Sequence, residues 1–155
     1  MDKNLRKRVL QKMTYGLYVA TARAGERIAA GSVTWLSQCS FHPPLVMAGF
    51  QRGSRLREVV AAAHAFAIHI VGKSQKPFAT TFFKAPVLKD GTLSGYAFET
   101  GAPILLDAPA WFECRVVDHL HRGDHWIYVA EIVAAGVRRD EEPLSLREAG
   151  FSYAG

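Results

Sequence analysis

Two long β-prone runs and a short turn make up residues 111–137, WFECRVVDHLHRGDHWIYVAEIVAAGV. The first run extends from Trp111 to about His121, and the second extends from His125 to about Val137. Between them lies Arg122-Gly123-Asp124, a combination of polar residues and glycine that tight turns favour. This pattern predicts a long antiparallel hairpin and therefore a fold in which β-structure dominates.

The sequence before this hairpin carries the same pattern in shorter form. Apolar, β-branched and aromatic runs bounded by Gly or Pro predict further strands over residues 15–22, 28–36, 45–50 and 66–71. Mostly antiparallel strands with a few short helices favour a β-barrel, because closing a sheet removes its exposed edges.

Helical signals are few and short. We expect helices over residues 4–13, over 55–63 after an N-cap at Ser54, and after Ser74 in the segment that carries Phe78, Phe82 and Phe83. Glycines and prolines predict an irregular segment over residues 85–103, and residues 143–152 are expected to form one helical turn.

Length and composition limit the class of protein. The chain has 155 residues, of which 49% are hydrophobic and 21% charged, and we expect a single domain over residues 1–155. No stretch approaches the ~20 apolar residues that a membrane span needs. The basic first eight residues lack the apolar segment of a signal peptide, so we expect a cytoplasmic protein.

Charge and cysteine content exclude further classes. The net charge of +5 comes largely from basic residues near the N-terminus and from scattered single residues. Because basic and aromatic residues are not interleaved, we do not expect nucleic-acid binding, although a positive surface would suit a ligand that carries phosphate. Cys39 and Cys114 are far apart, and we expect two free thiols.

Motifs of several enzyme classes are missing. We find no Gly-x-Gly-x-x-Gly, no P-loop, no Gly-x-Ser-x-Gly and no His-Glu-x-x-His. His119, His121 and His125 surround the predicted turn and could surround a zinc ion, but polar groups at a solvated hairpin end explain them better. We therefore expect no metal site. A nucleophile at Cys39 or Ser40 beside His42 is also disfavoured, because strand spacing does not ensure their contact.

Two polar stretches are candidates for ligand binding. Residues 32–40, SVTWLSQCS, place polar groups on both faces of a predicted strand, which suggests the lining of a polar, planar ligand. Residues 51–55, QRGSR, lead directly into a predicted helix. Backbone N–H groups, a hydroxyl and guanidinium groups at a helix start are typical of a phosphate site. A plain surface role for Arg55 stays open.

The order of short motifs along the chain resembles one known family. From about residue 13 to 137 the chain resembles the flavin reductase-like family of FMN-binding split barrels. The matching stretches are residues 14–19 (TYGLYV), 40–46 (SFHPPLV), 52–55 (RGSR), 66–70 (FAIHI), 82–83 (FF), 101–105 (GAPIL), 111–114 (WFEC) and 123–132 (GDHWIYVAEI).

This resemblance implies a fold and a cofactor site. The implied fold is a six-stranded antiparallel Greek-key split β-barrel with a few short helices, which forms a homodimer with one FMN at each end of the interface. His125 is implied to lie near the flavin and the nicotinamide as the catalytic residue. The other implied site residues are Ser32, Thr34, Trp35, Ser37, Gln38 and Ser40 around the flavin ring and ribityl chain, Gln51, Arg52, Ser54 and Arg55 around its phosphate, and Phe82, Phe83 and Lys84 near the cofactor.

The implied activity is that of an NAD(P)H-dependent flavin reductase. It would transfer hydride from the nicotinamide to FMN, or to FAD, and pass electrons or reduced flavin to a partner such as a monooxygenase. The alternative is an FMN-binding electron-transfer or flavin-holding protein without efficient NAD(P)H oxidation. Trp35-Leu36, where many members carry paired serines and a phenylalanine, resembles relatives that keep their flavin. A split barrel that binds haem or another ligand is the third reading.

Overall fold

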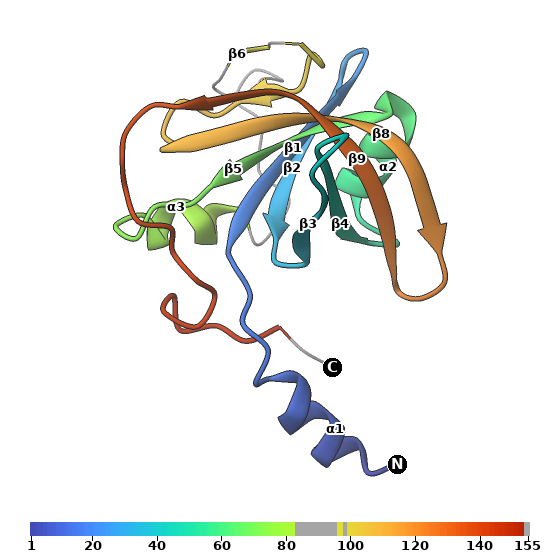
Figure 1. Ribbon diagram of the computed structural model, residues 1–155, viewed down its shortest axis with the longest axis vertical. Helices are drawn as coiled ribbons and strands as arrows, with labels where there is room; N and C mark the ends of the chain where they lie inside the picture. Colours follow the sequence, from blue (N-terminus) through green and yellow to red (C-terminus); the bar gives the residue numbers. More distant parts are fainter. Residues whose placement is uncertain (83–95, 98, 154–155) are drawn as a thin grey trace.

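The computed structural model describes residues 1–82, 96–97 and 99–153, and these form a mainly β structure with few helices (Figure 1). The predicted irregular segment 85–103 falls largely outside the described residues. The described elements are, in chain order, α1 (Lys3–Leu10), β1 (Tyr18–Ala24), β2 (Arg27–Val33), β3 (Leu36–Ser40), β4 (Leu45–Gln51), α2 (Arg55–Ala63), β5 (Ala65–Ile70), α3 (Lys76–Thr81), β6 (Tyr96–Ala97), β7 (Pro103–Ile104), β8 (Ala110–His121) and β9 (His125–Val137).

One antiparallel sheet carries seven strands in the order β2-β1-β5-β8-β9-β4-β3, and β6 pairs with β7 separately. The predicted long hairpin is confirmed, because β8 and β9 pair from Ala110↔Val137 to His121↔Trp126. In Figure 1 this hairpin, coloured orange to red, curves across the molecule and extends beyond the other strands.

The predicted count of six strands is wrong for this sheet, because the chain breaks where a single strand over 28–36 was expected. β2 ends at Val33 and pairs with β1, whereas β3 starts at Leu36 and pairs with β4 at the opposite end of the sheet. At the break, Gly49 N–H donates to the Trp35 carbonyl at 2.8 Å. A side chain at Gly49 would press on Trp35, so this glycine makes room for the crossing. Within the described residues the strand ladders run from β2 to β3 without closing.

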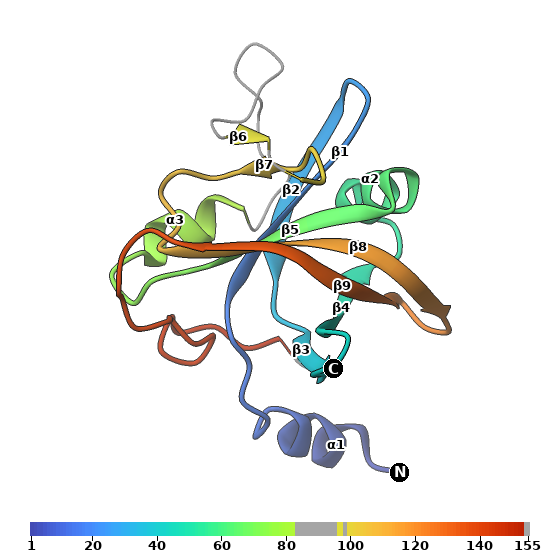
Figure 2. The same cartoon turned by 45° about the horizontal axis from the view of Figure 1, so that its top comes forward.

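α2 begins at its predicted residue. The Ser54 hydroxyl accepts a hydrogen bond from Arg57 N–H at 3.2 Å, which satisfies a free donor of the first turn. Leu56, Val59 and Val60 are buried on one side of α2, which packs mainly against β1 and β2. By contrast α1 has no buried residue and stands away from the sheet in both views (Figure 2).

After β9 the chain turns back along the sheet in residues 139–153, which we call the strap. The strap meets the remainder of the described chain through two isolated bridges, Gly16↔Ser145 and Gly72↔Pro143, and through the buried side chains of Leu144, Leu146 and Ala149. Its expected helical turn is present as one hydrogen bond from Ala149 N–H to the Ser145 carbonyl at 3.0 Å. None of the helices in the described residues has the length and apolar character that crossing a membrane requires.

Candidate functional site

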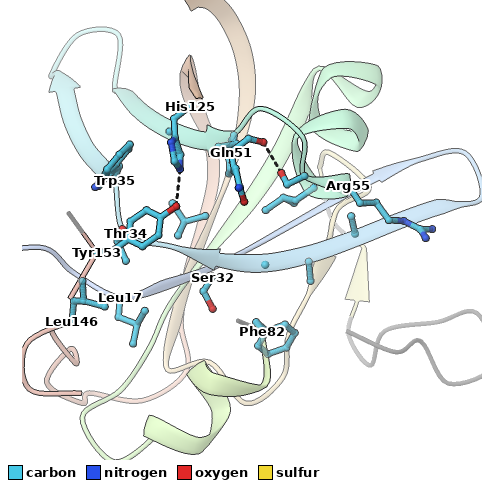
Figure 3. Close-up of a pocket in the computed structure, with 18 of the residues that line it drawn as sticks. Leu17, Ser32, Thr34, Trp35, Gln51, Arg55, Phe82, His125, Leu146 and Tyr153 are labelled. Carbon is cyan, nitrogen blue, oxygen red and sulfur yellow. Dashed lines mark hydrogen bonds between the residues drawn. The ribbon is translucent and has the colours of Figure 1, made fainter. Parts of the chain in front are cut away.

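A cavity of about 610 Å³ lies between β2, the junction of β4 with α2, the start of β9 and the end of the strap (Figure 3). This volume falls within the range of about 300–1,000 Å³ that is usual for ligand and cofactor sites. Leu17, Val33, Leu56 and Phe82 supply apolar walls, and polar side chains stand at intervals along them.

Many of the predicted site residues meet at this cavity. Ser32, Thr34, Trp35, Gln51, Ser54, Arg55, Phe82 and His125 all line it. Phe83 and Lys84 lie outside the described residues. Ser37, Gln38, Ser40 and Arg52 do not line the cavity of this chain. Ser37 and Gln38 lie exposed on β3, where each donates to a nearby backbone carbonyl.

The start of α2 forms one end of the cavity. The Ser54 hydroxyl donates to the Gln51 carbonyl at 2.9 Å while it caps the helix, so its own proton is already used. The neighbouring Arg57 is engaged too, because its guanidinium lies 4.6 Å from the centre of the Trp126 ring and its Nε donates to the Arg52 carbonyl. Arg55 forms no hydrogen bond or ion pair with any described residue, which leaves its charge available to an anion.

The other end of the cavity is aromatic. The centres of the Trp35 and His125 rings are 4.3 Å apart, and that of Tyr153 lies 5.5 Å from Trp35 and 5.7 Å from His125. Asp124 Oδ1 lies 2.9 Å from His125 Nδ1, and the Tyr153 hydroxyl lies 2.9 Å from His125 Nε2. The hydrogen bond from His125 lowers the pKa of Asp124, whereas burial raises the pKa of Tyr153.

The three histidines of the hairpin do not converge. His119 and His121 share one face of β8, with ring centres 4.4 Å apart, and His121 stacks on Trp126. His125 is adjacent to Trp126 in β9, so its side chain points to the opposite face, toward the cavity. Among the described residues, no group of three or more His, Cys, Asp and Glu side chains is placed to hold a metal ion.

Sequence reasoning missed the part of the site that the strap supplies. Leu146, Phe151, Ser152 and Tyr153 line the cavity, and Tyr153 forms the hydrogen bond to His125. Leu17, just before β1, lines it as well. The sequence predicted only one helical turn over residues 143–152 and did not indicate that this segment reaches the site.

The lining fits a flavin in its chemistry. Apolar walls and aromatic rings suit a planar ring system, hydroxyl and amide groups suit a polar chain, and the unpaired Arg55 suits a phosphate. In addition, the buried Trp35 Nε1 has no hydrogen-bond partner among the described residues. Such a donor calls for an acceptor from a ligand or from water.

Comparison with known proteins also indicates a protein that binds flavin. A family model described as "Flavin reductase like domain" matches residues 10–154. The NADH-dependent flavin reductase StyB of Pseudomonas fluorescens is 31% identical over 141 residues, which cover 90% of this chain and 82% of that protein. The NADH:FMN oxidoreductase of Rhodococcus qingshengii is 26% identical over 134 residues, covering 86% of this chain and 70% of that protein.

Among solved structures, the styrene monooxygenase flavin reductase of Pseudomonas putida S12 superimposes with a TM-score of 0.79 at 27% identity, covering 99% of this chain and 97% of that one. The family match, the relatives and this superposition agree with the cavity described above, and the chain belongs to the flavin reductase-like domain family.

Proposed function

We propose that this protein is an NAD(P)H-dependent FMN reductase that passes electrons or reduced flavin to a partner such as a monooxygenase. The observation that carries this proposal is the cavity, in which an unpaired guanidinium stands at one end and an aromatic cluster stands at the other. The names of two relatives, an NADH-dependent flavin reductase and an NADH:FMN oxidoreductase, support the reaction class. The flavin reductase of a styrene monooxygenase supports the kind of partner.

The position of each residue in the cavity suggests its role in binding the flavin. Arg55 and the backbone N–H groups at the start of α2 would hold the phosphate, while Gln51 reaches the cavity beside them. Ser32, Thr34 and Trp35 would line the ribityl chain and the ring, with Phe82 as an apolar wall. The bound flavin would itself supply the hydride-accepting chemistry, so the protein needs few acid or base groups. His125 would orient the ligand ring at the aromatic end.

We further propose that the protein is a homodimer. Met47 and Leu120 are 44% and 53% exposed, which is high for large apolar side chains. By strand alternation they lie on the same face of the sheet as Ile127 and His125, beside the aromatic end of the cavity. Ser37 pairs with Met47, so a second subunit on this face would cover Ser37 and could bring the remaining predicted residues to the site.

The deciding experiment loads the purified protein with one equivalent of FMN without oxygen and then adds NADH or NADPH. Rapid loss of the oxidised flavin absorbance establishes the reductase and identifies its nicotinamide. Tight binding without this loss sinks the reductase proposal in favour of an electron-transfer or flavin-holding protein. If FMN does not bind at all, the cofactor assignment itself fails, and the absorbance spectrum of the protein as purified shows whether another chromophore is bound.

A further inference from the structure

Three polar side chains form a chain at the aromatic end of the cavity. Asp124 contacts His125 Nδ1 and the Tyr153 hydroxyl contacts His125 Nε2, each at 2.9 Å. Figure 3 shows the Tyr153 ring turned toward His125 from the strap, with its hydroxyl on the dashed bond. Both nitrogens of the imidazole are therefore engaged within the protein.

Asp124 and Tyr153 together determine which nitrogen of His125 carries the proton. An ionised carboxylate can only accept, so Nδ1 of His125 carries the proton that it donates to Asp124. In this Nδ1–H tautomer, Nε2 accepts from the Tyr153 hydroxyl. The tyrosine oxygen keeps its lone pairs, and these are the acceptors that the chain leaves free for a ligand in the cavity.

The ring spacing decides which side chain a ligand meets. A planar ligand that is sandwiched between two rings needs about 7 Å between them, twice the roughly 3.5 Å of a carbon contact. The centres of Trp35 and Tyr153 are only 5.5 Å apart and tilted by 56°. A planar ligand therefore cannot lie between these two rings in this arrangement, and it approaches the aromatic end past Tyr153.

We propose that Tyr153 is a further positioning and specificity-determining residue of this site. Its bond to Nε2 holds His125 in the Nδ1–H tautomer, and its oxygen accepts a hydrogen bond from an N–H of the bound ligand. Both a flavin ring and the carboxamide of a nicotinamide offer such a donor. The identity of the ligand rests on the proposed function, whereas the hydrogen-bond chain does not.

The hydrogen-bond chain is tested in the ligand-free protein by long-range ¹H–¹⁵N NMR, which distinguishes histidine tautomers. We expect His125 to be mainly the Nδ1–H tautomer, and Tyr153→Phe to raise the Nε2–H fraction several-fold. The matched control is Tyr15→Phe, because the Tyr15 hydroxyl contacts Met13 Sδ outside this cavity. A wild-type Nε2–H tautomer, or a Tyr153→Phe spectrum equal to the wild type, overturns the assignment.

The ligand contact is tested by binding. Loss of one hydrogen bond predicts about a five- to tenfold weaker affinity in Tyr153→Phe. A loss of that size for FMN assigns the contact to the flavin. Unchanged FMN affinity with a raised KM for the nicotinamide assigns it to the carboxamide. No change in either, or tighter FMN binding, overturns the specificity role. If the wild type binds no FMN, the proposed function fails, and the NMR result still decides the link between Tyr153 and His125.

Discussion

The two walls of the cavity are built differently. On one side all seven residues of β4 pair with β9, and the side chains of Val46, Ala48 and Phe50 are buried beneath them. On the other side, the strap joins no ladder of the main sheet. It meets the remainder of the described chain at isolated bridges from Ser145 and Pro143, and it buries Leu144, Leu146 and Ala149 in a smaller apolar cluster. The first wall forms with the sheet, whereas the second depends on this apolar cluster and on a few separate hydrogen bonds.

This difference has a consequence for motion as well as for stability. Segments with fewer buried apolar contacts than the main core open at a lower free energy, and the cluster that holds the strap is smaller than the one that holds β4. We therefore expect the strap to open locally while β4 and β9 stay paired. Tyr153, which we expect to contact the ligand, therefore lies on the wall that opens at the lower free energy.

The largest expected effect comes from the sheet wall. Phe50 is 2% exposed, and its ring packs 5.3 Å from that of Phe66 and 5.7 Å from that of Tyr128. We expect Phe50→Ala to lower the free energy of unfolding by about 3–5 kcal/mol, through lost burial and an unfilled cavity, as measured by urea denaturation. Phe151→Ala, in the strap, is the matched change and should cost clearly less, because Phe151 is only partly buried. Equal losses would show that both walls belong to one cooperative core.

Arg55 gives the next effect, on binding rather than on folding. We expect Arg55→Ala to weaken FMN binding by about 1.5–3 kcal/mol, because one charge-assisted hydrogen bond to the phosphate is lost. Flavin fluorescence quenching measures the affinity, and Arg23→Ala, at an exposed position of β1, controls for the change in net charge. If both variants bind alike, the phosphate does not lie at α2. Ser54→Ala is a poorer test, since it also removes the helix cap at a cost of about 1 kcal/mol.

His69 makes the sheet sensitive to acid. Its Nδ1 donates to the Val19 carbonyl and its Nε2 accepts from Leu105 N–H, and burial lowers its pKa to about 4. Between pH 6.5 and 4 the unfolded chain binds a proton that the folded chain does not. Stability therefore falls as the pH drops through this window and is constant with respect to His69 above it.

From pH 7.5 to pH 5 this linkage removes about 2 kcal/mol of unfolding free energy. His69→Phe should be less stable at neutral pH, since the Leu105 N–H loses its acceptor, but its loss between these two pH values should be smaller by that amount. Urea denaturation at both pH values checks this. An equal slope in the wild type and the variant would remove His69 from the acid response.

The sheet wall was largely predictable, and the reason is local. A continuous apolar run after two prolines predicted a strand over residues 45–50, and a good N-cap predicted a helix over 55–63. The structure has Leu45–Gln51 and Arg55–Ala63. The break at Thr34 and Trp35 was not predictable, because both halves are β-prone. The break depends on Gly49. Its N–H donates to the Trp35 carbonyl, and the absence of a side chain there leaves room for Trp35.

The site residues on the sheet and on α2 were predictable from the sequence, whereas those on the strap were not. Ser32, Gln51 and Arg55 belong to the sheet and to α2, and their polar runs marked them. Tyr153 had no such signal, because the strap has no periodicity and takes its place from distant partners. One of these contacts, between Glu141 and Ser74, joins residues 67 positions apart. Such contacts follow only from the assembled fold.

The smallest expected effect on global stability is at that contact. Glu141 accepts from the Ser74 N–H and hydroxyl with Oε1 and from Arg139 Nε with Oε2, and these bonds lower its pKa to about 2. Its carboxylate also fills the space that a side chain at Gly72 would take. We expect Glu141→Ala to speed hydrogen exchange at the amides of Leu144 and Leu146, which bond to Val71 and Tyr15, while the amides of β4 exchange as before.

The carboxylate is ionised at neutral pH and loses its charge only as the pH falls from about 4.5 toward 2, so acid should loosen the wild-type strap over that range. Glu26→Ala, in the turn between β1 and β2, removes a charge of the same sign and should change neither set of amides. Faster exchange in both the strap and β4 of Glu141→Ala would mean that the two walls open together. Faster exchange in the strap alone would show that the side of the cavity carrying Tyr153 opens while the sheet stays paired.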